Sequence, residues 1–279
     1  RDNSTSKTRL YARGRWTPSR KDSISFDYSV SLLQYDTPSD LNNDERDEFS
    51  TIAGISYGRK ISPLLSAGLS SEIQMTHLVF LKAAKSAMNN WNRIIRLAPY
   101  VHIESARFLY APVFEVLANY TAYDFEEKSP SVESFSYRQL GYRDTLCIRL
   151  HKSLSIQTRT IIKYFERGTL YWNSFDESPQ TGSFEQFSKA LFVTQKGNIT
   201  AGCGARIYYM TQRNISENLI KLSPGSEFTH RYIGPELIFR AYFDSGTVLS
   251  VNGWYEFQYF NEVKKDEIPN IFLNVKWIL

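Results

Sequence analysis

Polar and apolar residues alternate along most of this chain. In the stretch 24–32, ISFDYSVSL, every apolar residue but the last is followed by a polar one. Because successive side chains of a strand point to opposite faces of a sheet, this stretch predicts a strand with one apolar and one polar face. Such a strand could line the core of a soluble sandwich or the wall of a membrane barrel.

The same alternation recurs in thirteen segments, and no segment sustains the apolar spacing of a helix. The predicted strands cover residues 8–17, 22–36, 48–61, 64–81, 90–104, 106–124, 134–150, 153–166, 184–195, 198–212, 230–243, 247–261 and 270–279.

The connections alternate in length as well. The short turns are predicted at 17–22, 59–63, 104–107, 151–153, 195–197 and 244–247. The long polar loops between them are predicted at 36–47, 82–90, 125–133, 167–183, 213–229 and 262–269. Short turns at one end and long loops at the other are typical of an antiparallel, up-and-down transmembrane β-barrel, whose short turns lie in the periplasm. The pattern therefore predicts an all-β protein of the bacterial outer membrane, in a Gram-negative cell.

An odd number of strands needs an explanation, because bacterial single-chain barrels have an even number. We expect a 14-stranded barrel with one strand upstream of Arg1, or the C-terminal part of a larger barrel. A miscounted strand is the alternative. Residues 1–279 are thus interpreted as a single transmembrane domain that lacks its N-terminal part.

Composition agrees with this interpretation. Apolar residues make up 42% of the chain, with a mean hydropathy of -0.37, and no stretch approaches the ~20 apolar residues of a membrane helix. The net charge of +4 is spread along the strands, so it does not favour nucleic-acid binding. The two cysteines, Cys147 and Cys203, give no disulfide framework or metal spacing, and we expect no cofactor and no metal site.

The last nine residues, IFLNVKWIL, place apolar side chains at every second position from Ile271 to Leu279. This segment resembles the C-terminal strand signal of bacterial outer-membrane proteins, although those usually end in an aromatic residue. The resemblance implies that the outer-membrane assembly machinery recognises Ile271–Leu279. It also implies contact with the lipid bilayer and lipopolysaccharide, and it leaves room for a periplasmic or surface protein partner.

The polar face of the predicted sheet carries many charges. They could form a field that selects solutes by the sign of their charge, or they could pair with one another inside the barrel. Bulky residues assigned to the same face, including Ile161 and Phe192, favour a narrow or plugged interior. The predicted lumen-facing charged residues are Arg13, Asp27, Glu72, Arg96, His102, Glu115, Arg143, Arg149, Arg159, Arg206, Glu236, Arg240 and Glu256.

Two functions from different classes follow. The first is a narrow channel or passive transporter of small solutes. The second is a barrel that anchors or scaffolds a larger outer-membrane assembly. A phospholipase-like enzyme is a distant third, because His151-Lys152-Ser153 lies in a predicted periplasmic turn without a nearby Asn. We expect no enzyme.

One pairing can be predicted in detail. The turn between strands 90–104 and 106–124 is short enough to fix their register. Placing Ile103 opposite Phe108 keeps both apolar faces on the same side of the sheet. That register puts Arg96 directly opposite Glu115 on the polar face.

Overall fold

The computed structural model describes residues 3–39, 41–128, 132–215 and 228–277. One antiparallel sheet holds all the strands, and two short 3-10 turns, η1 (Ala83–Met88) and η2 (Glu126–Lys128), lie in connections. Within the described residues, no helix is both long and apolar enough to cross a membrane. The strands are β1 (Ser4–Trp16), β2 (Asp22–Asp36), β3 (Arg46–Lys60), β4 (Leu65–Phe80), β5 (Asn90–Glu104), β6 (Phe108–Tyr110), β7 (Val113–Tyr123), β8 (Phe135–His151), β9 (Leu154–Tyr171), β10 (Asp176–Lys196), β11 (Ile199–Asn214), β12 (Phe228–Tyr242), β13 (Val248–Phe260) and β14 (Val263–Lys276).

Each strand pairs with its neighbours in sequence, so the predicted all-β, antiparallel, up-and-down fold is confirmed. Strands β6 and β7 are two parts of one crossing, since both pair with β5 and with β8. Pro112 lies in the break between them and has no N–H to donate to the ladder. The fourteen strands therefore make the thirteen crossings that the alternation predicts.

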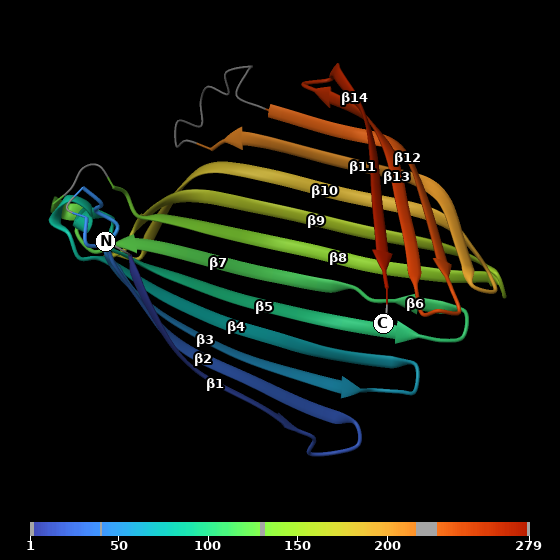
Figure 1. The fold of residues 1–279 in the computed structure, drawn as a ribbon, viewed down its shortest axis with the longest axis horizontal. Helices are drawn as coiled ribbons and strands as arrows, with labels where there is room; N and C mark the ends of the chain where they lie inside the picture. The colour runs from blue at the N-terminus through green and yellow to red at the C-terminus, as the bar shows by residue number, and fades with distance from the viewer. Residues whose placement is uncertain (1–2, 40, 129–131, 216–227, 278–279) are drawn as a thin grey trace.

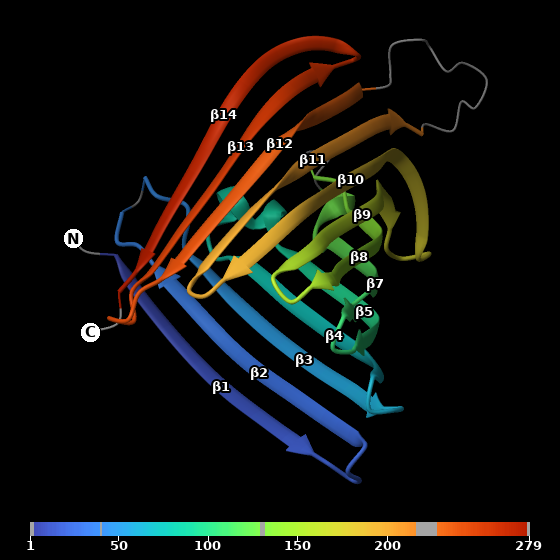
Figure 2. The ribbon, with the colours of Figure 1, turned by 90° about the vertical axis from the view of Figure 1, so that its right-hand side faces the viewer.

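The sheet is strongly curved (Figures 1 and 2). Figure 2 shows β1–β4 and β10–β14 on opposite sides, with the strands between them joining the two. Strands β1 and β14 are the edges of the sheet, and in the described part of the chain neither has a second strand partner. The expected additional strand upstream of Arg1 stays a prediction.

Where a strand has one apolar and one polar side, the apolar side lies on the convex face. In β2, Tyr28 is 43% exposed and the next residue, Ser29, is 8% exposed. Residues on the inside of a curve are crowded by their neighbours, so the buried polar positions mark the concave face. The convex face then presents exposed Phe26, Ile73 and Leu237 outward, as the wall of a membrane barrel does.

The short turns lie where they were predicted. Two of them use glycine in the left-handed region, Gly197 at φ 57° and Gly246 at φ 79°, where a side chain would strain the backbone. The loops at 36–47, 82–90 and 125–133 also separate strands as expected. Most of the loop 213–229 lies outside the described residues.

Two predicted long loops are wrong. Most of 167–183 belongs to β9 and β10, which extend to Tyr171 and from Asp176, and a break in register between Pro179 and Thr181 bends the hairpin. The Ser, Gly and Pro residues of this segment suggested a loop, but its backbone groups are satisfied by cross-strand pairing.

The predicted loop at 262–269 is also strand. Strands β13 and β14 are joined by Asn261 and Glu262, with φ 44° and 63°. Positive φ at both central residues is the conformation of a tight hairpin turn that matches sheet twist. The charged run after Glu262 reads as a loop from composition, yet it forms the exposed edge strand, where charge is common.

The predicted register between strands β5 and β7 is wrong by two residues. Ile103 pairs with Tyr110, and Arg96 pairs with Leu117 instead of Glu115. The turn is centred one residue later than expected, because the Ser105 N–H donates to the Phe108 carbonyl oxygen, 2.7 Å away, and leaves residues 106–107 at the tip. An even shift keeps every side chain on its predicted face.

Candidate functional site

The concave face holds all the charged residues that the sequence assigned to it. One row of directly opposite residues crosses β1–β5 and contains Arg13, Asp27, Gly54, Glu72 and Arg96. Opposite charges are neighbours at both ends of this row, so it is balanced by itself. The remaining residues share this face through alternation and pairing, namely His102, Glu115, Arg143, Arg149, Arg159, Arg206, Glu236, Arg240 and Glu256.

Glu236 is the centre of an ion-pair cluster on β10–β13. The residue is 3% exposed. Lys189 Nζ lies 2.8 Å from its Oε1, and Arg206 Nε lies 2.9 Å from its Oε2. A buried carboxylate is costly unless it is paired and hydrogen-bonded, and both of its oxygens are used here.

Arg206 connects this cluster to β13. Its Nη1 lies 3.6 Å from Glu256 Oε1, which also accepts a 2.9 Å hydrogen bond from Trp254 Nε1. The guanidinium is 4.3 Å from the centre of the Trp254 ring, a cation–π distance. Arg206 is thus held on several sides and is positioned as a structural link.

Gly204 allows β10 and β11 to approach each other closely beside the cluster. Gly204 is directly opposite Glu236, and a Cβ there would come within 1.9 Å of the Ala190 carbonyl oxygen. The strands approach too closely at this point for any side chain.

A second ion pair joins β5 and β7. Arg96 Nη2 lies 2.6 Å from Glu115 Oε2, and Gln139 Nε2 donates to Glu115 Oε1 at 3.0 Å. The predicted contact therefore forms, but diagonally, since the register that was to produce it is wrong. Long side chains reach diagonal neighbours in a sheet.

A second row of opposite residues is not balanced. Arg206, Lys189, Arg159 and Thr145 face one another in order across β11, β10, β9 and β8. Like charges directly opposite each other destabilise a sheet. Glu236 offsets the first two cations, whereas Arg159 has no ion-pair or hydrogen-bond partner among the described residues.

A recess of about 150 Å³ opens beside Arg159 on the concave face. Gly141 lies in its wall, between Glu115 on β7 and Lys163 on β9. Arg143 also lines it and, like Arg159, is exposed and unpaired within the described ranges. Lys163 is 3.4 Å from Glu185. The recess therefore carries excess positive charge.

The other predicted residues are spread over the face. His102 Nε2 lies 3.1 Å from Glu104, and Arg149 Nη1 donates to the Ala106 carbonyl oxygen at 2.9 Å. Arg240 Nη1 is 3.4 Å from the Tyr242 hydroxyl. These groups lie near the short turns and are not gathered into one site.

The alternation pattern did not assign Lys189 and Glu185 to the concave face, where the structure places them. Strand β10 carries apolar residues on both faces, with Phe187 and Leu191 on the concave side and Phe184 and Phe192 on the convex side. Its faces were therefore assigned in reverse. Phe192, expected in the lumen, is 56% exposed on the convex face. The neighbouring strand β9 could have corrected this assignment. Its charged residues Arg159 and Lys163 mark its concave face, and the residues that pair with them on β10 must share that face.

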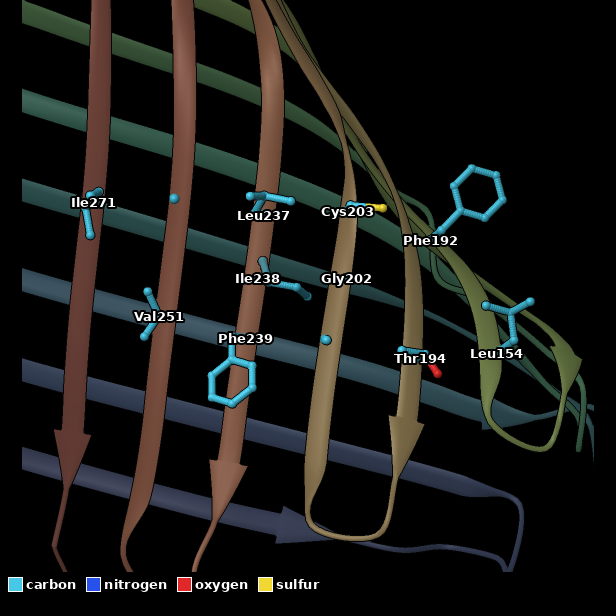
Figure 3. A pocket seen from close by; sticks show the side chains of 12 residues that line it. Leu154, Phe192, Thr194, Gly202, Cys203, Leu237, Ile238, Phe239, Val251 and Ile271 are labelled. Carbon is cyan, nitrogen blue, oxygen red and sulfur yellow. The ribbon is translucent and has the colours of Figure 1, made fainter.

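An apolar groove of about 670 Å³ runs over the convex face of β9–β14 (Figure 3). Phe192, Cys203, Leu237 and Ile271 are among the residues that line it. Its apolar lining fits the acyl chains of a surrounding bilayer rather than a polar solute.

A polar hollow of about 730 Å³ lies at the loop end. The tip of the β9–β10 hairpin packs over the convex face there, with the Arg93 guanidinium 4.2 Å from the Trp172 ring centre and Phe175 5.5 Å from Tyr120. Asp124 and Glu126 line the same hollow. The Arg93 guanidinium also lies 5.2 Å from the Trp91 ring centre, so this cation already contacts two aromatic rings.

Neither the turn at His151–Ser153 nor the loop 36–47 forms a catalytic or metal-binding arrangement among the described residues. His151 Nδ1 lies 3.4 Å from Ser153 Oγ in an exposed turn. In the acidic loop 36–47, Lys85 pairs with Asp44 and holds the pKa of that carboxyl below its ordinary value. Among the residues that the structure describes, no three His, Cys, Asp or Glu side chains gather as metal ligands.

The fold resembles that of a solved structure, although the sequence comparisons found no relative. No protein-family model matches the chain, and no curated protein matches its sequence. Among solved structures, the copper transporter OprC matches with a TM-score of 0.64 and 12% sequence identity. The match covers 91% of this chain and 45% of that protein, so this chain spans less than half of its length. The similarity shows a shared antiparallel β-sheet fold.

Proposed function

We propose that this chain forms the wall of a bacterial outer-membrane barrel and passes small solutes along its concave face. The observation that carries the proposal is the pair of exposed arginines on that face, Arg143 and Arg159, which have no acidic partner among the residues that the structure describes. An unpaired charge is costly away from water, so such side chains are retained where water or solute reaches them. The resemblance to a transporter, OprC, supports the same class of function.

The apolar convex face supports the membrane location. Its exposed side chains would contact the bilayer and the acyl chains of lipopolysaccharide. Ile271 and Leu273 on β14 are 81% and 61% exposed, and Trp277, directly after this strand, is 73% exposed, which suits recognition of the segment by the assembly machinery. Ile278 and Leu279, the end of the segment Ile271–Leu279, lie outside the described residues.

Passage of ions tests the function directly. The full chain, assembled in a planar bilayer, is expected to show stepwise conductance with a preference for anions. The Arg143→Gln/Arg159→Gln double variant is expected to shift the reversal potential towards cation preference, because it removes two unpaired cations from the wall. Absence of conductance from protein that shows heat-modifiable migration on gels would contradict solute passage.

That negative outcome would instead favour a membrane anchor for a larger assembly. The ion pairs of Arg96 with Glu115 and of Arg206 with Glu236 give this second function some support. These ion pairs link side chains of neighbouring strands on the concave face, which suits a wall with a structural function. Copurification of a periplasmic or surface partner would then be the next observation.

A further inference from the structure

We infer that the recess beside Gly141 binds an oxyanion, the carboxylate or phosphate group of a small solute, between Arg143 and Arg159. The inference rests on the proposed function, since it names the chemical class of the solute that passes along this face.

Charge balance distinguishes this place from the rest of the concave face. The row across β1–β5 sets Arg13 opposite Asp27 and Arg96 opposite Glu72, so each cation has an acidic neighbour. The row across β8–β11 sets Arg159 opposite Lys189, a like charge. A bound anion would supply the missing negative charge.

The acidic groups nearest the recess are already engaged. Glu115 lines it but pairs with Arg96 at 2.6 Å, and Glu185 lies 3.4 Å from Lys163. Neither Arg143 nor Arg159 receives a carboxylate in the described part of the chain. Both guanidinium groups are therefore available to a ligand.

Size and chemistry agree on the class of ligand. A volume of about 150 Å³ holds a few water-sized groups of roughly 30 Å³ each. That suits a phosphate or the end of a short dicarboxylate, and not a whole sugar. Two planar guanidinium groups provide the forked donors that match the oxygens of a carboxylate or phosphate. The glycine at position 141 leaves the space open, because a Cβ there would lie 3.3 Å from Glu115 Cβ.

Binding can be tested without an open pore. Inorganic phosphate, and in a second arm succinate, is titrated calorimetrically into the full chain in detergent at fixed ionic strength. The Arg143→Gln/Arg159→Gln variant is expected to bind at least tenfold more weakly than the unchanged chain. The matched control, Arg13→Gln/Arg240→Gln, removes the same charge from the same face and is expected to change affinity less than twofold.

An equal loss in both double variants would overturn the inference in favour of diffuse attraction, and so would absence of binding by the unchanged chain. Binding of phosphate without succinate, or the reverse, would keep the site and narrow its ligand. If the double variant fails to assemble, each single variant is compared with Arg240→Gln. A threefold or greater loss in either supports the site, and none in both refutes it. Because binding is measured in detergent, a barrel that binds phosphate but does not conduct would separate this inference from the proposed function.

Discussion

Replacing Glu236 by Gln is expected to lower the free energy of unfolding by about 3–5 kcal/mol, because removing one partner of a buried ion pair leaves uncompensated charge. Lys189 and Arg206 face each other directly across β10 and β11, and both donate to this one carboxylate. Gln at position 236 can accept hydrogen bonds but cannot offset two cations. The loss is measured as a shift in the denaturant midpoint of the protein in lipid vesicles.

Glu72→Gln provides the control. Glu72 lies on the same concave face and has no hydrogen-bond or ion-pair partner in the described ranges. Its replacement is expected to change stability by less than about 1 kcal/mol, as for a solvated charge. Adding Lys189→Gln to Glu236→Gln should recover part of the loss, since it relieves the repulsion. Equal destabilisation by Glu236→Gln and Glu72→Gln would refute the central place given to Glu236.

The second large effect is expected on the convex face. Ile73 lies midway along β4, opposite Ala53 and Ile95, and is 45% exposed. Replacing it by Arg should cost about 2–4 kcal/mol if the site faces the middle of the bilayer. The neighbouring change Gln74→Arg places the same charge on the concave face and should cost much less. Similar costs at both positions, measured by unfolding in vesicles, would argue against lipid on the convex face.

Clean alternation made the fold predictable from sequence. Along β2, Phe26 and Tyr28 alternate with Ser25 and Asp27, and such strands reveal both their existence and their faces. The thirteen crossings and their antiparallel order follow from repeating this pattern. Where both faces carry apolar residues, as in β10 with Phe187 and Phe192, alternation cannot show which side faces inward.

The turns were less predictable, because single backbone hydrogen bonds determine where each turn begins and ends. The hydrogen bond from the Ser105 N–H to the Phe108 carbonyl oxygen moves one turn along the chain by one residue and so shifts the β5–β7 register by two residues. Asn261 and Glu262 make a tight turn that the following charged residues conceal. Loop-like composition also concealed residues 167–171 of β9 and residues 176–183 of β10, which were predicted as loop.

The candidate site depended on both kinds of information. Sequence placed Arg143 and Arg159 on the polar face, but it could not show which cations lack partners. The strand register is needed to show that Arg159 lies opposite Lys189. The side-chain positions are needed to show that Glu236 pairs with Lys189 and Arg206. Gly141 gave no sequence signal, because a recess appears only when its neighbours on β7 and β9 are known.

The most direct test of the two-faced wall is a spin-label scan along β2 in a Cys147→Ser/Cys203→Ser background, with the protein in lipid vesicles. Labels at Phe26 and Tyr28 are expected to be relaxed mainly by oxygen, which concentrates in lipid. Labels at Ser25 and Asp27 are expected to be relaxed mainly by a polar nickel chelate, because the concave face contacts water. High accessibility to the chelate at all four positions, or the reverse order, would contradict a membrane barrel with this orientation.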